Sequence, residues 1–245
     1  MHPKCTEYDA VIVGSGPNGL SAGILLAQHG LSVLILEAKT TIGGGTRTQE
    51  LTQSGYLHDV CSAIHPTAFA APFLKTLPLS DYGLDWCFPT FQVAHPLDNG
   101  DAVVISKNLT ETIKRLGTDG QAYHKLVHGL ITNWDAISHD LFGPIRVPKN
   151  PIALSKFGLK AIQSAKQLAK STFREERNRT FFAGLAGHSI LPLEQRFTAS
   201  FGLIFAASLH VADWAIAKGG SASITTAMAN YFRSLGGDIQ TSTKI

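Results

Sequence analysis

The chain has 245 residues, 44% of them hydrophobic and 16% charged, which is the composition of an ordinary globular protein. Its formal net charge of +3 is too small to indicate nucleic-acid binding, and no basic cluster with interleaved aromatic residues is present. Cys5, Cys61 and Cys87 are widely spaced, so we expect free thiols in a reducing compartment and no dithiol chemistry. The N-terminus lacks a signal-peptide pattern, and a cytoplasmic protein is the expectation.

The first predicted element is a strand over residues 8–13 (YDAVIV), whose β-branched apolar run is typical of a buried parallel strand. Gly14, Gly16 and Gly19 follow it at GxGxxG spacing. In such a turn the first glycine permits the sharp bend and the second lets backbone approach a pyrophosphate. The third lets the next helix pack closely on the sheet.

That helix is predicted over residues 18–29, with Leu20, Ile24 and Ala27 on one face and Gly30 as a left-handed C-cap. A second buried strand is predicted over residues 31–36, ending at Glu37. An acid about 20 residues beyond the glycines is the expected acceptor for a ribose hydroxyl, and its charge disfavours a 2′-phosphate and therefore NADP. Together these features predict adenine-dinucleotide binding; the alternative is a tight turn that binds no nucleotide.

A second glycine cluster, Gly43, Gly44 and Gly45, follows Glu37 by six residues. It is either a flexible loop or a second place where backbone amides approach a phosphate or ribitol chain. A simple NAD domain has no need of a second contact there, so the cluster favours FAD over NAD.

The segments GSGPNGLSAG (14–23), Glu37, Gly43-Gly44 and GYLHDVCSAIHP (55–66) resemble the phytoene desaturase and carotenoid oxidoreductase family, within the amine-oxidase-like flavoproteins. The nearest branch is the phytoene-dehydrogenase-like group that includes pyridine nucleotide-disulfide oxidoreductase domain-containing proteins. The resemblance implies FAD and a Rossmann-like α/β domain with an inserted, partly helical α+β substrate or cap region. It also implies these cofactor-binding residues: Gly14, Ser15, Gly16, Pro17, Asn18, Gly19, Glu37, Ala38, Gly43, Gly44, Thr46 and Ile245.

One position departs from that family, which commonly has arginine directly after the glycine doublet to hold the flavin phosphates. This chain has Gly45 there, and the nearest arginine is Arg47. Whether Arg47 takes over that role is left open by the sequence.

The middle of the chain predicts a hairpin at Asn99-Gly100 and then a helical stretch over residues 109–141 with Thr110 as N-cap. His124 and His128 share one helix face. Lys125 stands where a metalloprotease has its glutamate, and no third ligand is evident. We therefore expect surface histidines and no metal site.

Residues 144–179 contain nine Lys or Arg and only two Glu, so this stretch is formally +7 and the rest of the +3 chain is −4. Phe157, Ala161 and Leu168 interleave with lysines and predict a basic amphipathic helix over 156–170. Two interpretations stay open: a solvated helix face, which we favour, and peripheral contact with an anionic membrane. Residues 199–217 form a long apolar run, but His210 and Asp213 interrupt it, which favours a buried helix over a membrane span.

The last residues predict a helix with Ile224, Ala227 and Met228 on one face, closed by Gly236-Gly237, and a strand over 238–245. The resemblance implies that this segment returns the chain to the FAD domain, with Ile245 contacting adenine through its backbone. The family continues well beyond that point. We therefore expect exposed sheet edges and apolar surface, and a partner chain is one source of the remaining half.

The resulting organisation is an FAD-binding βαβ segment at 1–66, a substrate or cap region at 67–217, and a returning helix and strand at 218–245. The leading functional hypothesis is an FAD-dependent oxidoreductase that passes hydride from an apolar small-molecule substrate to flavin. The alternatives are an FAD- or ADP-binding module without turnover, and an NAD-dependent dehydrogenase. His58, Asp59 and His65 are expected near the flavin, in structural roles, and no catalytic residue is predicted.

Overall fold

The computed structural model describes residues 7–66, 71–143, 145 and 147–245, and the chain divides into two compact units. Unit 1 comprises residues 1–65, 73–87 and 215–245, and unit 2 comprises residues 66–72 and 88–214. Cys5, and Arg146 of the basic stretch, lie outside the described residues. Residues 73–87 fold with the nucleotide-binding segment, although the sequence placed them in the substrate region.

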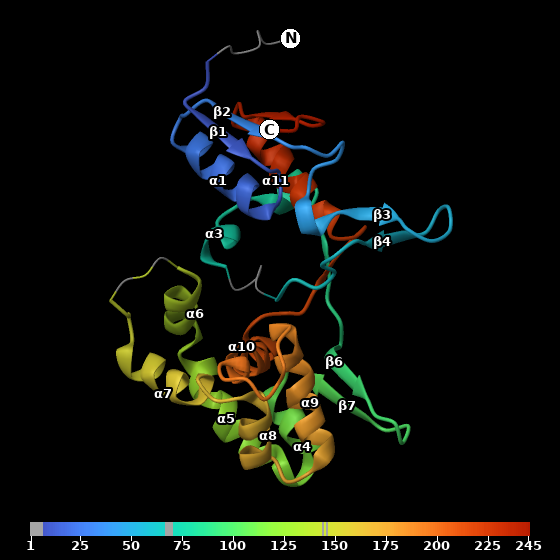
Figure 1. Cartoon of the computed structure of the whole chain (residues 1–245), viewed down its shortest axis with the longest axis vertical. Helices are drawn as coiled ribbons and strands as arrows, with labels where there is room; N and C mark the ends of the chain where they lie inside the picture. The colour runs from blue at the N-terminus through green and yellow to red at the C-terminus, as the bar shows by residue number, and fades with distance from the viewer. Residues whose placement is uncertain (1–6, 67–70, 144, 146) are drawn as a thin grey trace. The chain divides into compact units, whose positions relative to one another are not determined.

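Unit 1 is built on a parallel three-stranded sheet of order β1-β2-β9 (Figure 1). Its strands are β1 (Ala10–Val13), β2 (Val33–Leu36) and β9 (Asp238–Gln240). Helices α1 (Pro17–Gln28) and α11 (Ala222–Ser234) pack on each other, and their apolar side chains share one core with the sheet. The predicted return of the C-terminal segment to the nucleotide-binding domain is therefore confirmed.

Short elements complete unit 1. They are η1 (Gly44–Thr46), β3 (Thr48–Glu50), β4 (Leu57–Asp59), α3 (Pro72–Lys75), η2 (Leu79–Tyr82), β5 (Trp86–Cys87) and β8 (Ile216–Ala217). Strand β3 pairs with β4, and β5 pairs with β8, in both cases antiparallel.

The helix predictions for unit 1 are confirmed: Leu20, Ile24 and Ala27 are buried, and Gly30 has φ +81°. Two strand predictions need correction. Strand β1 is not buried on both faces, because Val11 and Val13 are 54% and 71% exposed on the face opposite the helices. The last strand ends at Gln240, since beyond it no ladder continues and residues 242–243 instead bond to the backbone of residues 37–39.

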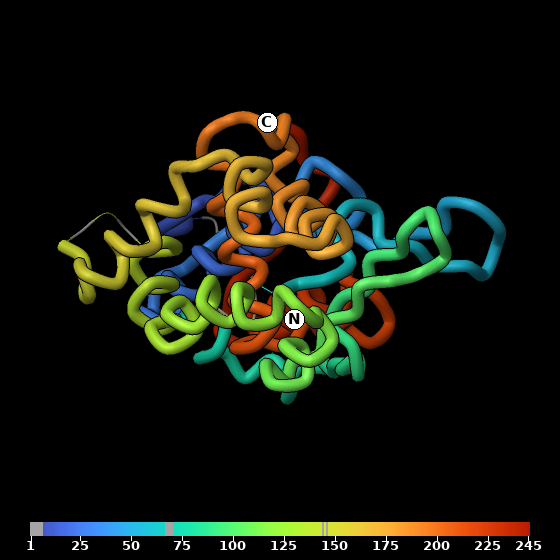
Figure 2. Tube along the Cα trace, turned by 90° about the horizontal axis from the view of Figure 1, so that it is seen from below, coloured from blue at the N-terminus to red at the C-terminus, as the bar shows by residue number. Residues whose placement is uncertain are grey.

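Unit 2 is mainly helical, with one antiparallel hairpin of β6 (Phe91–Pro96) and β7 (Ala102–Ser106) that confirms the predicted Asn99-Gly100 turn. The turn end of this hairpin points away from the helices of its own unit in both views (Figures 1 and 2), whereas Val103 and Ile105 of β7 are buried in their core. The helical elements are α4 (Leu109–Arg115), η3 (Gly117–Asp119), α5 (Gly120–Thr132), α6 (Trp134–Phe142), α7 (Pro151–Ala161), α8 (Ala165–Thr172), α9 (Glu176–Ala186), η4 (Gly187–Ser189) and α10 (Thr198–Val211).

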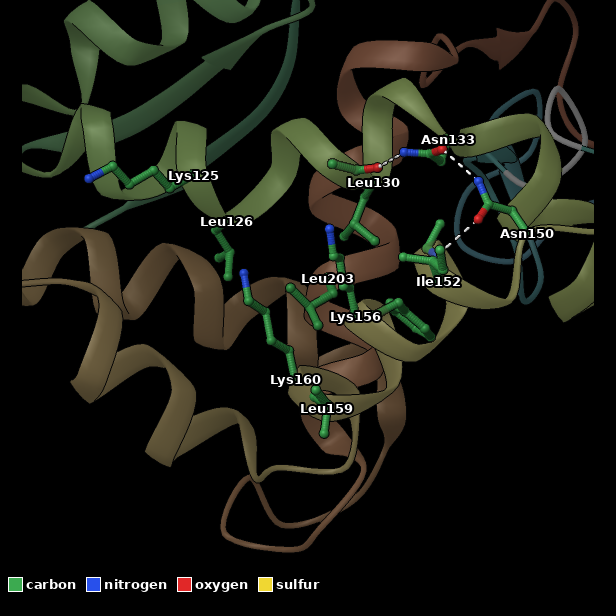
Figure 3. A pocket seen from close by; sticks show the side chains of 13 residues that line it. Lys125, Leu126, Leu130, Asn133, Asn150, Ile152, Lys156, Leu159, Lys160 and Leu203 are labelled. Atoms are coloured by element: carbon green, nitrogen blue, oxygen red, sulfur yellow. Dashed lines mark hydrogen bonds between the residues drawn. The ribbon is translucent and has the colours of Figure 1, made fainter.

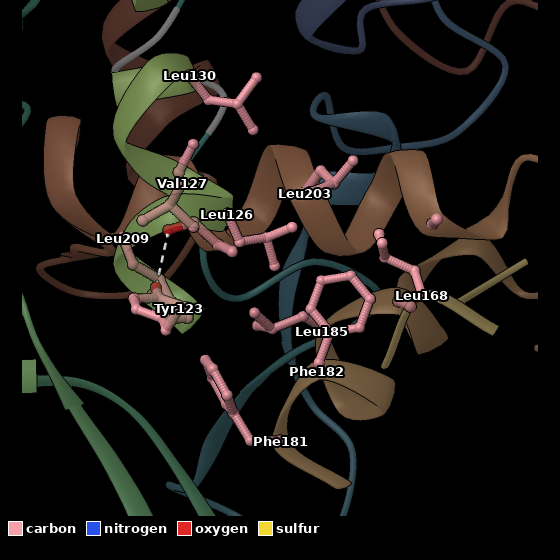
Figure 4. Packing of buried hydrophobic residues seen from close by; sticks show 14 of the residues in the cluster. Tyr123, Leu126, Val127, Leu130, Leu168, Phe181, Phe182, Leu185, Leu203 and Leu209 are labelled. Carbon is pink, nitrogen blue, oxygen red and sulfur yellow. Dashed lines mark hydrogen bonds between the residues drawn. The ribbon is translucent and has the colours of Figure 1, made fainter. Parts of the chain in front are cut away.

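Helix α10 passes through the core of unit 2 against α5 and α9 (Figure 4). The aromatic ring of Phe182 lies where a Cβ on Gly202 would stand, with its Cζ atom 2.7 Å from that position. The absence of a side chain at Gly202 thus lets α9 and α10 approach closely. The burial predicted for this apolar run is confirmed, since Ala199, Leu203 and Leu209 are fully buried.

Three boundaries in unit 2 differ from the prediction. Asn108, not Thr110, caps α4, because its side chain accepts from Glu111 N at 3.0 Å. The apolar helix ends at Val211, and Ile216–Ala217 form a strand instead.

The third difference concerns the basic helix predicted over 156–170, which is two helices, α7 and α8. Ser164 caps the second by accepting from Gln167 N at 3.1 Å, so a capping side chain stands where a continuous helix would need an interior residue. Within the part of the chain that the structure describes, no helix combines the length and apolarity needed to cross a membrane.

Candidate dinucleotide-binding site

The first glycine turn (residues 14–19) joins β1 to α1 and has the backbone that the sequence predicts. Gly14 has φ +97°, a conformation that side-chain-bearing residues rarely adopt, and its amide donates to Leu36 O at 2.7 Å. A Cβ on Gly19 would stand 2.0 Å from Gly14 O, so only glycine fits there. The close contact of Gly19 is thus with the turn itself. Gly23 is the glycine that lets α1 pack closely on the sheet, because a Cβ there would stand 2.9 Å from Ile35 Cδ1.

The N-terminus of α1 is open to a ligand. Gly16 is the N-cap residue, Pro17 is the first helical residue, and no side chain caps this end. The first amides of a helix have no partner within it and carry partial positive charge, so this end favours an anion. Ser15 is fully buried below the turn, whereas Asn18 is exposed.

The second glycine loop (residues 43–46) packs directly against the first glycine turn. Gly43 N donates to Ser15 O at 3.1 Å, and a Cβ on Gly44 would stand 3.0 Å from Gly16 Cα. Gly43 and Gly44 both have positive φ, +116° and +56°. The two glycine-rich segments, some 28 residues apart in the sequence, therefore form one continuous backbone surface. Thr46 is buried beneath it, and its hydroxyl donates to Gly43 O at 2.8 Å.

Glu37 lies at the end of β2, 8% exposed, and holds this surface together. Its Oε2 accepts from Ser15 N at 3.0 Å and from Ser15 Oγ at 2.7 Å, and its Oε1 accepts from Lys39 N at 2.9 Å. A carboxylate accepts about four hydrogen bonds, so capacity remains for a ligand hydroxyl. Burial opposes ionisation of Glu37, but the bonds from Lys39 and Ser15 and the charge of Arg47 outweigh it and lower the pKa of Glu37.

Arg47 follows the second glycine loop and carries a buried Nε with no hydrogen-bond partner among the described residues. Its side chain lies beside Gly43, where a Cβ would stand 3.2 Å from Arg47 Cγ. A buried, unpartnered guanidinium nitrogen next to a glycine loop fits an anionic group. The resembling family has its arginine two positions earlier, where this chain has Gly45.

The remaining predicted residues lie at the margin of the site. Ala38 is exposed beside Glu37. The C-terminal segment runs alongside, because Thr243 N donates to Glu37 O at 2.9 Å and Ser242 N to Lys39 O at 2.8 Å. Ile245 follows this segment and is 77% exposed.

A polar network that sequence reasoning did not assemble joins β3 and β4 to the start of α11. Asp59 Oδ1 accepts from Thr48 Oγ1 and from Ser221 N, both at 2.7 Å. Gly220 has φ +96°, and a Cβ there would stand 2.6 Å from Thr48 Oγ1. The contacts with Ser221 join residues more than 150 positions apart, and only the glycine pair before Ser221 hints at them in the sequence.

His65 belongs to the same network through its bond with Ser221. Ser221 Oγ donates to Ser62 O at 2.5 Å, so at 2.8 Å it accepts from His65 Nε2, which therefore carries the proton. Burial lowers the pKa of His65, with Asp59 opposing that shift in part. The structural role expected for Asp59 and His65 agrees with these bonds. His58 lies on exposed β4 and contacts Thr52 Oγ1 at 2.8 Å.

The histidine pair on α5 and two of the cysteines, Cys61 and Cys87, lie within the described residues. The rings of His124 and His128 are 4.8 Å apart on α5, and the described residues contain no group of three side chains able to hold a metal ion. Cys61 and Cys87 are free and exposed.

Comparison with known proteins agrees with this geometry. Residues 12–76 match the NAD(P)-binding Rossmann-like domain family. A limonene dehydrogenase protein of Castellaniella defragrans is 29% identical over 110 residues, which are 45% of this chain and 20% of that protein. Flavin-containing amine oxidase A of Bos taurus is 40% identical over 60 residues, 24% of this chain and 11% of that protein.

Solved structures extend the likeness to nearly the whole chain. Wild-type putrescine oxidase bound to putrescine is 21% identical with a TM-score of 0.60, covering 96% of this chain and 51% of that one. Rab GDI from Plasmodium falciparum is 13% identical with a TM-score of 0.55, covering 96% of this chain and 57% of that one. The chain thus shares its fold with these proteins and spans about half the length of these structures.

Proposed function

We propose that this chain binds FAD and forms part of an FAD-dependent oxidoreductase that takes hydride from an apolar substrate. The observation that carries the proposal is the paired glycine backbone: Gly16 and Gly44 in contact, with Glu37 buried beneath the turn. A single glycine turn serves any adenine dinucleotide. A second glycine loop laid against it, followed by Arg47, offers anion contacts that a simple NAD domain does not use.

The residues present fit FAD in chemical terms. The open N-terminus of α1 and the Arg47 Nε would hold the pyrophosphate, and Glu37 would accept a ribose hydroxyl. The lowered pKa of Glu37 keeps it ionised near neutral pH, which would repel a 2′-phosphate and exclude NADP. When bound, FAD would supply the hydride acceptor, while this chain binds and orients it.

The nature of the substrate is inferred from two observations. The limonene dehydrogenase protein is named for an apolar hydrocarbon, and it shares 29% identity over 110 residues with this chain. The second is the abundance of apolar side chains in the core of unit 2, where α5, α9 and α10 meet. Both the apolar donor and the hydride transfer are proposals for the whole protein.

The test is titration of the purified chain with FAD and, separately, with NAD, followed by visible absorption and flavin fluorescence. Saturable flavin binding with little NAD affinity is expected. Glu37→Gln should weaken FAD binding about tenfold, about 1.4 kcal/mol. Both oxygens of Glu37 accept hydrogen bonds, so the NH₂ group of glutamine would face a donor such as Lys39 N. The matched control Glu50→Gln, on exposed β3, should bind like the parent. A folded chain that binds NAD but not FAD would overturn the proposal.

The second candidate is an FAD- or ADP-binding module without turnover. It is favoured by the likeness to Rab GDI, which is not named as an oxidoreductase, so the fold alone does not imply catalysis. Flavin that binds to the chain but is not reduced by any apolar donor, even with the remaining half of such a protein added, would favour this candidate.

A further inference from the structure

Unit 2 contains a groove of about 490 Å³ between α5 and α7, with Leu203 of α10 at its base (Figure 3). We refer to it as the lysine groove. It is lined by Lys125, Leu126, Gly129, Leu130, Asn133, Asn150, Ile152, Ala153, Lys156, Phe157, Leu159, Lys160 and Leu203. Every lining residue belongs to unit 2, so the groove is a property of that unit alone.

Apolar side chains line the lysine groove both at its buried base and at its exposed rim. Leu126, Phe157 and Leu203 are buried members of the unit 2 core, whereas Ile152 and Leu159 are each 69% exposed at the rim. Gly129 leaves the α5 side open, because nothing lies within 4 Å of where its Cβ would stand. An apolar surface continuous from rim to base favours an apolar chain as occupant.

The two asparagines are not free to bind such an occupant. Asn150 Nδ2 donates to Asn133 Oδ1 at 3.0 Å, and Asn150 Oδ1 accepts from Ala153 N at 3.1 Å. Asn133 Nδ2 in turn donates to Gly129 O at 2.9 Å. Both amides therefore fix the start of α7 to α5, and the uncommitted polar groups of the groove are the ammonium groups.

Lys156 and Lys160 extend from α7 toward α5, while Lys125 points the other way along the rim (Figure 3). None of the three has a carboxylate partner among the described residues, and no acidic residue lines the groove. Other lysines of this chain form ion pairs: Lys166 Nζ lies 2.9 Å from Glu194 Oε1, and Lys107 Nζ lies 2.7 Å from Asp213 Oδ2. Burial lowers the pKa of Lys160, as expected for an ammonium group that has lost water without gaining a counter-charge.

We infer that the lysine groove binds a single-chain anionic amphiphile: an acyl or isoprenoid chain lying along Leu126, Phe157 and Leu203, with a carboxylate or phosphate head on Lys156 and Lys160. An anion there would supply the missing counter-charge, and the chain would cover the exposed rim. This site is independent of the proposed flavin chemistry, because no residue of unit 1 takes part.

The experiment uses the full chain and isothermal titration with dodecanoate, dodecyl phosphate and uncharged dodecanol. Both anions should bind, and dodecanol should bind at least tenfold more weakly. Lys156→Gln/Lys160→Gln should weaken dodecanoate binding at least tenfold. The control Lys149→Gln/Lys170→Gln makes the same change in net charge outside the groove and should leave binding unchanged.

A second pair of variants tests the space rather than the charge. Gly129→Leu should fill the groove and abolish binding, whereas Gly158→Leu, on α7 but outside the lining and equally unobstructed, should not. If Gly129→Leu fails to fold, the lysine pair still decides the question. Equal binding of dodecanol, or binding that survives the lysine double variant, would overturn the inference.

Vesicles containing anionic lipid separate the two sources of such a head group. Suppose that the chain binds vesicles in a lysine-dependent way but does not bind free dodecanoate. The lysine groove would then be a membrane-contacting surface, and the inference would also be overturned. FAD affinity, measured in parallel, should be the same in all these variants. Loss of flavin binding with dodecanoate binding intact would therefore count against the proposed function alone.

Discussion

Among the described residues, Glu37 of unit 1 and Asp119 of unit 2 are the buried carboxylates, and they differ in how far a ligand can reach them. Glu37 in unit 1 accepts three hydrogen bonds and keeps 8% exposure at the ligand side of the glycine turn. Asp119 in unit 2 is 1% exposed and accepts from Arg174 N at 2.8 Å, Glu175 N at 2.9 Å and Asn178 Nδ2 at 3.0 Å. Both carboxylates accept three hydrogen bonds, but Asp119 is sealed from solvent and supports the start of α9, whereas Glu37 holds a turn and stays accessible to a ligand.

The same contrast runs through the two units. Unit 1 is shaped by backbone contacts between glycines, and its sheet leaves Val13 71% exposed. Unit 2 is shaped by side chains: Tyr123, Phe181, Phe182 and Leu203 are buried together (Figure 4). The stability of unit 1 should therefore be sensitive to the addition of single Cβ atoms at its glycines. The stability of unit 2 should be sensitive to the loss of side-chain atoms from its core.

The largest effect is expected from Gly19→Ala. The new methyl group would overlap Gly14 O, which is backbone and has no room to shift, so unit 1 should lose about 3 kcal/mol or more of stability. Thermal unfolding and flavin absorption should both report the loss. Gly158→Ala, with open space in α7, should instead stabilise by about 0.5–1 kcal/mol. Equal effects of the two changes would contradict the proposed difference between the units.

Asp119→Asn should destabilise unit 2 by about 2 kcal/mol. The carboxylate accepts from the backbone N–H groups of Arg174 and Glu175, whereas the NH₂ group of asparagine would face one of these donors. FAD affinity should not change. The control Asp135→Asn lies on the exposed side of α6 and should be neutral in denaturant unfolding. A large loss of flavin binding in Asp119→Asn would contradict the expectation that this carboxylate serves only the fold of unit 2.

Tyr123→Phe should cost about 1 kcal/mol. His210 Nδ1 contacts Lys107 O at 3.0 Å and must donate, so Nε2 is an acceptor; the Tyr123 hydroxyl lies 2.8 Å from this Nε2 and 3.3 Å from a second acceptor, Ala206 O. The variant removes this hydroxyl donor. Tyr82→Phe, whose hydroxyl contacts Ser234 near the surface, should change the unfolding midpoint much less.

The smallest effects concern pH. Burial lowers the pKa of His95 and of His210, so the unfolded chain binds more protons and stability should begin to fall as pH drops below about 6.5. The pKa values of Glu37 and Asp119 are also lowered; their contributions persist above the unfolded values near 4 and are lost below them. Unfolding free energy measured from pH 8 to 3 should show both steps. His210→Gln should reduce the upper step, and an unchanged profile would contradict the assignment.

Local features of the nucleotide turn followed from short-range chemistry. Gly14 and Gly30, at the two ends of the segment that holds α1, adopt the positive φ values that their positions between predicted strands and helix require. Leu20, Ile24 and Ala27 are buried, as their helical spacing predicts. These signals lie within a few residues of one another and depend on steric rules that act before the chain folds.

Other features could not be derived that way. The pairing of β5 with β8 joins segments distant in the sequence, and the break between α7 and α8 comes from the Ser164 cap, which the spacing of apolar residues and lysines does not reveal. The spacing of residues also did not predict that the backbone of Gly44 packs against that of Gly16. Nor did it predict that no acidic side chain lines the groove into which Lys156 and Lys160 extend.

The sequence by itself therefore determined the turn, its capped helix and the acid after the second strand, because backbone conformation and periodicity are local. Only the tertiary structure decided which backbone surfaces meet and which charges are left unpaired. Both are set by burial and by long-range contact, and a partner more than 100 residues away leaves no periodic mark on the sequence.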